Sequence, residues 1–175
     1  YGIDPGDILV ITFTRAAAEE MRERYEALTG GGSRVTFGTF HSIFFRILKL
    51  AYRYTADNIV REEQQMQFVR ELAQAGGLEP EDENEFAASI LSEISSVKGE
   101  RIALEHYYSK NCPDAVFRQL YAGYEEKMRR AGLIDFDDMM VLCLELFTER
   151  KDILSAWQRR YRYILIDEFQ DINRL

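Results

Sequence analysis

Two adjacent carboxylates near the end of this 175-residue chain have the residue types and position of a metal-assisted phosphoryl-transfer site. Asp167 and Glu168 directly follow Tyr163–Ile166, a short apolar run typical of a buried parallel strand. In open α/β sheets, ligands bind beyond the carboxyl ends of the strands. Paired acids there can hold hydrated Mg²⁺ and align an attacking water. A bare Asp-Glu pair more often marks a solvated turn, but the longer string DEFQD (residues 167–171) is much rarer by chance.

Two further strand ends carry polar residues suited to binding phosphate groups. An apolar run at residues 8–11 leads into TFTR, and a further short strand predicted at residues 34–38 leads into TFHS. Thr14 and Thr39 are placed to cap the helices that follow, and the free N–H groups and dipole of a helix start attract anions. Arg15 would add a positive charge, while His41 and Ser42 would add hydrogen-bond donors.

Phe13, between these polar residues, offers a ring on which a nucleic-acid base can stack, worth about 1–3 kcal/mol per base. The combination predicts a track for phosphates and bases with little reading of base sequence. Simpler interpretations stay open for each residue. Thr14 and Thr39 can serve as caps alone, Phe13 can belong to the core, and His41 can make a local hydrogen bond.

The order of elements predicts an α/β fold that is interrupted by helices. Residues 7–53 show the pattern strand, helix, strand, helix, which is typical of a parallel sheet with right-handed crossovers. Strand signals then stop until Tyr163–Ile166, and apolar residues recur at helical spacing. We therefore expect a partial sheet from residues 1–44 and 161–175, with an all-helical insertion over residues 45–160.

Composition limits the protein class. The sequence has no apolar run long enough to span a membrane and no signal peptide. Its two cysteines, Cys112 and Cys143, have no motif spacing, which favours free thiols in the cytoplasm. The net charge of −8 argues against a generally basic nucleic-acid binder, but residues 79–85 alone carry −5. Local basic groups at residues 127–130 and 159–162 leave a nucleic-acid track open.

Four segments in order resemble motifs of the superfamily 1 DNA helicases of the UvrD/Rep/PcrA type. They are ILVITFTRAAAEEM at residues 8–21, TFGTFHS at 36–42, GLIDFDDM at 132–139 and ILIDEFQD at 164–171, the last resembling a Walker B motif. The resemblance implies a RecA-like motor domain of the P-loop NTPase type, called 1A, interrupted by a helical subdomain called 1B. It also implies ATP-driven movement on single-stranded DNA, unwinding of duplex DNA, and repair proteins as partners.

The resemblance also implies roles for single residues. Asp167 would hold Mg²⁺, Glu168 would polarise the water that attacks ATP, and Gln170 would sense the γ-phosphate. The DNA track would be lined by Phe13, Thr14, Arg15, Thr39 and His41. The family often has Asn at the position of Arg15, so the resemblance supports that contact less directly.

The sequence departs from the family at one point. The Walker A loop, Gly-x-x-x-x-Gly-Lys-Thr/Ser, does not occur in the 175 residues, and no second motor domain is present. Because that loop cradles the β- and γ-phosphates, we expect no ATP hydrolysis by these residues alone. The chain also begins without Met and close to a strand, so we interpret it as a fragment of a larger helicase.

Three alternatives remain at this point. The first is a helicase–nuclease subunit of the AddA/RecB type, which shares the motifs. The second is a non-catalytic module that binds DNA or a protein through the basic group at residues 127–130. The third, a two-metal nuclease, would need Asp135, Asp138 and Asp167 close together, whereas the spacing of the first two favours a helix cap in a solvated first turn.

Overall fold

The computed structural model describes residues 2–32 and 34–167. These residues form two compact units, and each packs around its own core. The first unit comprises residues 2–53 and 142–167, and the second comprises residues 54–141. The change of unit therefore falls after residues 53 and 141, whereas the sequence suggested an insertion over residues 45–160.

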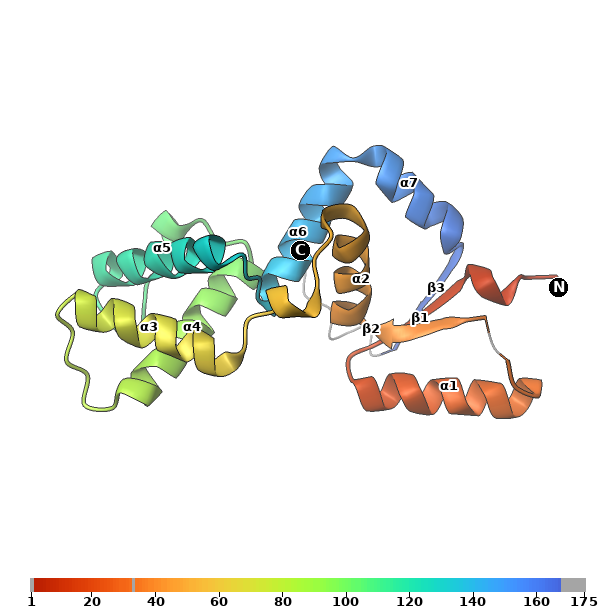
Figure 1. Ribbon diagram of the computed structural model, residues 1–175, viewed down its shortest axis with the longest axis horizontal. Coiled ribbons are helices and arrows are strands. Elements are labelled where there is room, and N and C mark those ends of the chain that lie inside the picture. Colours follow the sequence, from red (N-terminus) through yellow and green to blue (C-terminus); the bar gives the residue numbers. More distant parts are fainter. Residues whose placement is uncertain (1, 33, 168–175) are drawn as a thin grey trace. The chain divides into compact units, whose positions relative to one another are not determined.

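The first unit contains a three-stranded parallel sheet with the strand order β2-β1-β3. Figure 1 shows α1 on one side of the strands and α2 with α7 on the other. The α/β prediction with a parallel sheet is thus confirmed. The elements of this unit are β1 (Ile8–Thr12), α1 (Arg15–Thr29), β2 (Thr36–Thr39), α2 (Phe40–Tyr52), α7 (Lys151–Arg160) and β3 (Tyr163–Ile166).

Local sequence signals set the ends of these helices. Thr14 caps α1, and Gly30 ends it in the left-handed region at φ +83°, where a residue without Cβ is unstrained. Thr39 caps α2 through a reciprocal box with Ser42. Buried Leu9 and Ile11 in β1, with Ile43 and Ile47 in α2, form part of the core beneath the sheet.

One expectation about the sheet is wrong. Tyr163–Ile166 forms a strand as predicted, but its side chains are not buried on both faces. Ile164 is 57% exposed and Leu165 is 54% exposed. The reason is that α1 packs on β1 and β2, and α2 packs on β2, which leaves the outer strand β3 largely uncovered within the described residues.

The second unit is helical. It contains α3 (Glu62–Ala75), α4 (Glu83–Gly99), α5 (Asp114–Ala131) and the start of α6 (Phe136–Glu149), which continues into the first unit. Val69, Ile90, Phe117 and Tyr124 are almost completely buried in its core. The α4 helix begins directly after Asp82, because Asp82 accepts hydrogen bonds from the N–H groups of residues 84 and 85. None of the described helices combines the length and apolar character needed to cross a bilayer.

Candidate functional site

The carboxyl ends of the three strands lie along one edge of the sheet, which we call the rim (residues 12–15, 38–42 and 167). Thr12 of β1 pairs in register with Thr39 of β2, and Ile11 pairs with Ile166 of β3. The N–H of Asp167 donates to the carbonyl oxygen of Ile11 at 2.9 Å, which holds this acid at the level of the strand ends. The topology thus brings together segments more than a hundred residues apart in sequence.

The turn from β1 into α1 is held by its own hydroxyl groups. Thr12 is completely buried and donates to the carbonyl oxygen of Thr14 at 2.8 Å. The Thr14 hydroxyl accepts from the N–H of Ala17 at 3.1 Å, so this residue is a helix cap. These bonds fix the start of α1, and Arg15 is exposed in its first turn.

Phe13 is 42% exposed and therefore is not a core side chain. Its ring lies 5.4 Å from the ring of Phe40, tilted by 58°, and Phe40 lies 6.1 Å from Phe44. A row of aromatic rings thus begins at the rim and continues along α2. The contact with Phe40 orients one edge of Phe13 and leaves much of the side chain open to a stacking partner.

The turn from β2 into α2 is tightly packed. The Ser42 hydroxyl accepts from the N–H of Thr39 at 2.9 Å, and the N–H of Ser42 donates to the Thr39 hydroxyl at 3.2 Å. A Cβ at Gly38 would lie only 2.7 Å from the Ser42 Oγ and 3.1 Å from Ile43 Cδ1. Glycine is therefore needed at this position for the strand to approach the helix start. The His41 side chain is partly buried and is not without an interaction partner.

A groove of about 390 Å³ lies between the first two turns of α1 and the end of β2. Arg15, Arg22, Thr39 and Ser42 are among the residues that line it, and Arg22 forms an ion pair with Glu19. Sequence reasoning missed Arg22, although its spacing of seven from Arg15 places both on one face of a helix. The groove offers the guanidinium of Arg15, with Arg22 paired to Glu19 beside it, next to the starts of two helices, a chemistry that suits anions.

Glu168 and Gln170, which were predicted to act at a nucleotide, lie outside the described residues. Asp167 is described and is partly buried. Its carboxylate is of the hard oxygen type that Mg²⁺ prefers. Mg²⁺ often binds to one or two protein carboxylates and keeps several waters, so a single acid at the rim is compatible with this ion.

The second unit contains a buried ionic cluster that the sequence did not reveal. The Lys98 side chain is 4% exposed, and its Nζ lies 2.8 Å from Asp135 Oδ2, 2.7 Å from Asp138 Oδ1 and 2.7 Å from Glu125 Oε1. Asp135 and Asp138 also accept each other's backbone N–H groups, as the predicted cap requires. The prediction of a solvated first turn is wrong, however, because Asp135 is only 6% exposed.

The cluster changes proton affinities. Burial alone would lower the pKa of Lys98, but the three carboxylates, Asp135 foremost, raise it above its usual range. Burial, followed by repulsion from Asp135, raises the pKa of Asp138 to about 6 even though Lys98 acts in the opposite direction. An ammonium ion thus occupies the position that a metal would take between these acids. Across the described part of the chain, no three His, Cys, Asp or Glu side chains form a metal site.

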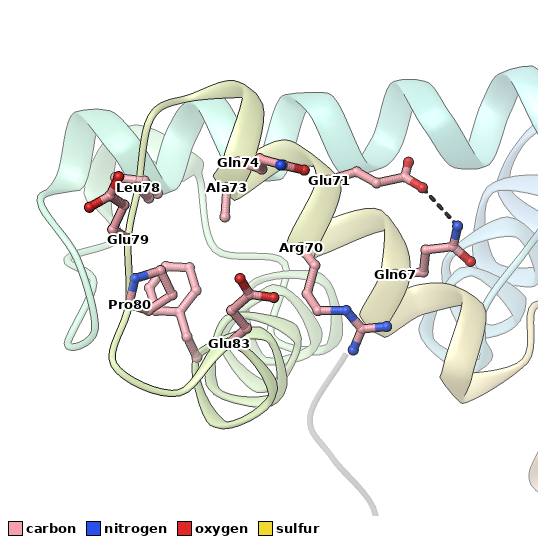
Figure 2. A pocket seen from close by; sticks show the side chains of 10 residues that line it. Gln67, Arg70, Glu71, Ala73, Gln74, Leu78, Glu79, Pro80 and Glu83 are labelled. Carbon is pink, nitrogen blue, oxygen red and sulfur yellow. Dashed lines mark hydrogen bonds between the residues drawn. The ribbon is translucent and has the colours of Figure 1, made fainter.

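The second unit also contains a pocket of about 560 Å³ beside α3 and the connection to α4. Figure 2 shows its lining, in which apolar Ala73, Leu78 and Pro80 lie beside one cation, Arg70, and the acids Glu71, Glu79 and Glu83. Arg70 already donates to Asn84 at 2.8 Å. Because acids outnumber the single cation, the pocket would repel a nucleotide, so the rim remains the better candidate for phosphate chemistry.

The basic residues near the end of α5 are neutralised in part. Lys127 lies 2.6 Å from Glu71, and both Arg129 and Arg130 contact Glu126. The alternative of a DNA-binding module at residues 127–130 needs free positive charge at this place. These ion pairs remove much of that charge and weaken the alternative.

Comparison with known proteins gives a consistent result. The model of the UvrD/REP helicase N-terminal domain matches residues 1–175. The chain is 37% identical to the putative ATP-dependent DNA helicase YjcD of Bacillus subtilis, over 98% of the chain and 23% of that relative. It is 34% identical to the ATP-dependent DNA helicase PcrA of Bacillus subtilis and 34% identical to DNA helicase II of Escherichia coli, in each case over 98% of the chain and 24% of the relative. The chain thus spans about a quarter of the length of these relatives.

Proposed function

Because this chain belongs to the UvrD/REP helicase N-terminal domain family, we propose that it is part of an ATP-dependent DNA helicase. The whole protein would move on single-stranded DNA and unwind duplex DNA in repair or recombination, with repair proteins as partners, in the cytoplasm. Relatives that carry the name ATP-dependent DNA helicase support the proposal. The observation that carries it is the rim, where three parallel strand ends and the starts of two helices meet.

The DNA track in this proposal runs along the rim. Phe13 stacks on a base, because its ring is exposed and held at one edge by Phe40. Thr14, Arg15, Thr39 and His41 bind the sugar-phosphate backbone. The groove beside α1 adds Arg22 as a further cation near the track. None of these contacts reads a base edge, which agrees with movement along DNA of any sequence.

The nucleotide site in this proposal begins at Asp167. This residue would hold Mg²⁺, which when bound would neutralise charge on the phosphates of ATP. Glu168 would orient and polarise the attacking water, and Gln170 would contact the γ-phosphate and connect the nucleotide with the DNA track. The bond from the N–H of Asp167 to Ile11 supports this coupling, because it ties the acid to the strand that ends directly before Phe13.

The two compact units suggest how the motor is divided. We assign the first unit to the partial RecA-like domain 1A and the helical second unit to the inserted subdomain 1B. The AddA/RecB-type helicase–nuclease stays an alternative within the same family of motors. No observation favours the non-catalytic module, because the basic residues near the end of α5 are paired with Glu71 and Glu126.

Binding of oligothymidylate, followed by fluorescence anisotropy at several salt concentrations, tests the proposed track. Phe13→Ala should weaken binding about tenfold, because it removes a stacked base contact. Arg15→Ala should weaken binding and reduce the salt slope by about one. Tyr108→Ala, which removes an aromatic side chain that is 73% exposed in the second unit, and Arg24→Ala, on α1 outside the groove, are matched controls.

The control variants should bind DNA like the unchanged protein. Loss of binding in Tyr108→Ala comparable to the loss in Phe13→Ala would contradict the rim as the DNA track. Binding that survives both rim substitutions but fails on Lys127→Ala or Arg130→Ala would favour the module instead.

A further inference from the structure

The helices α2 and α7 of the first unit are basic in an otherwise acidic protein. Residues 40–52 of α2 contain no Asp or Glu and carry a net charge of +2, and residues 151–160 of α7 also carry +2, whereas the whole chain carries −8. Both helices therefore carry a net positive charge within an acidic chain. Positive charge of this kind attracts and orients acidic partners.

A shallow groove of about 280 Å³ lies between these two helices. Its lining is mainly apolar and aromatic, from Leu50 on α2 and from Ala156, Trp157 and Tyr161 on or just after α7. Leu50 is 71% exposed, so most of its side chain is available to a partner. Trp, Tyr and Arg are the side chains most enriched at the centres of protein interfaces.

The aromatic wall of the groove is rigid. The rings of Trp157 and Tyr161 lie 5.7 Å apart with an angle of 30°. Tyr161 is 5% exposed, and its hydroxyl lies 3.1 Å from the Thr36 hydroxyl of β2, so the wall is anchored to the sheet. A preformed surface loses little conformational entropy when a partner binds.

Two arginines flank the apolar lining. Arg46 is exposed on α2, and the Arg160 guanidinium stands 5.5 Å from the centre of the Tyr161 ring. The acid that faces Arg160 is Asp4, which is itself paired with Arg34 at 2.5 Å. Arg160 therefore shares Asp4 with a second arginine.

We propose that the groove between α2 and α7 docks a short acidic segment of a partner protein that inserts one apolar side chain. The apolar residue packs against Leu50 and Trp157, and carboxylates on either side meet Arg46 and Arg160. A nucleic acid fits less well, because the exposed side chain of Leu50 has neither a charge nor a hydrogen-bond donor for a phosphate group. The proposal does not depend on the DNA track at the rim, since it uses different residues.

The chain contains a single tryptophan, so the fluorescence of Trp157 reports directly on this groove. The probe is a short synthetic peptide of Asp and Glu residues around one central leucine, without aromatic residues. Its addition should change the Trp157 fluorescence in a saturable way, and higher salt should weaken binding. A peptide with lysines in place of the acids, and one with alanine in place of the leucine, should bind at least about tenfold more weakly.

Variants of the protein locate the site. Arg46→Glu should weaken binding of the acidic peptide at least about tenfold, and Leu50→Ala about threefold. Lys49→Glu is the matched control, because it makes the same charge reversal on α2 outside the groove and should cost about twofold or less. Arg46→Ala, which should also weaken binding, serves as the second variant if circular dichroism shows that Arg46→Glu is not folded.

Three results would overturn the proposal. The first is the absence of a saturable change in Trp157 fluorescence. The second is equal weakening by Lys49→Glu and Arg46→Glu, which would mean diffuse attraction to the basic helices. The third is displacement of the peptide by oligothymidylate that binds more tightly than the peptide does. This result would make the face a nucleic-acid surface.

Discussion

At the scale of single residues, the most constrained charge among the described side chains is the ammonium of Lys98. It comes from α4 and contacts carboxylates on α5 and at the start of α6. Tyr124 completes the surroundings, since its ring lies 5.4 Å from the ammonium and its hydroxyl donates to Asp135 at 3.3 Å. One residue thus ties three helices of the second unit together. Such a cluster is costly to break, because each remaining charge is already out of water.

Lys98→Met tests this interpretation. It keeps most of the side-chain volume but leaves Asp135, Asp138 and Glu125 without their cation. We expect the free energy of unfolding to fall by about 3–5 kcal/mol, as for other buried pairs that lose one partner. Urea unfolding followed by circular dichroism measures the change.

The control for this variant is Lys127→Met, which breaks the more exposed pair with Glu71. Here we expect a loss of less than about 1 kcal/mol, because solvent screens the pair. Equal losses in the two variants would mean that Lys98 is no more important than a surface lysine.

At the scale of elements, the junction of β2 and α2 determines where the rim forms. Gly38→Ala places a methyl group against the Ser42 hydroxyl, which two hydrogen bonds with Thr39 hold in place. We expect a loss of about 1–3 kcal/mol in unfolding free energy, because the capping box must shift to make room.

A double-mutant cycle with Ser42→Ala checks the cause of that loss. Ser42→Ala alone should cost about 1 kcal/mol through the lost cap. The double variant should be more stable than the sum of the two losses predicts, because the clash is gone. Strict additivity would show that the cost of Gly38→Ala arises elsewhere.

Elements and caps could be predicted from the sequence because their signals are local. Thr14 and Thr39 cap the helices that follow them, as expected. Burial could not be predicted in the same way, since it depends on which other elements cover a strand. Tyr163–Ile166 has the composition of an interior strand and yet lies largely exposed.

The site shows the same division between local and distant information. The rim follows from the rule that parallel strands share their carboxyl ends, since Thr12 pairs with Thr39 and the N–H of Asp167 bonds to Ile11. The partner of Asp135 and Asp138 could not be predicted, because nothing near Lys98 in the sequence points to acids 37 and 40 residues away. The roles of Phe13 and Thr39 at DNA, and of Asp167 at a nucleotide, stay predictions.

At the scale of the whole molecule, the two units carry different chemistry. The first unit contains the rim and the groove between α2 and α7. The second contains a helical core, and the ion pairs of Lys98 join three of its helices. The chain corresponds to about a quarter of the relatives with which it aligns. Complete helicase activity therefore belongs to the proposal for the whole protein, whereas DNA binding at the rim can be tested on these 175 residues.

ATP turnover by the 175 residues themselves is the last prediction. A Walker A loop supplies backbone N–H groups and a lysine that cradle the β- and γ-phosphates. No Gly-x-x-x-x-Gly-Lys-Thr/Ser string occurs in this sequence, so Asp167 and Glu168 lack the group that would position ATP beside them. We expect phosphate release to equal that of a protein-free blank, with or without oligothymidylate. The Glu168→Gln variant distinguishes a trace contaminant from activity of this chain. Hydrolysis above the blank that is lost in this variant would contradict the prediction, because it would show that ATP can be positioned without a Walker A loop.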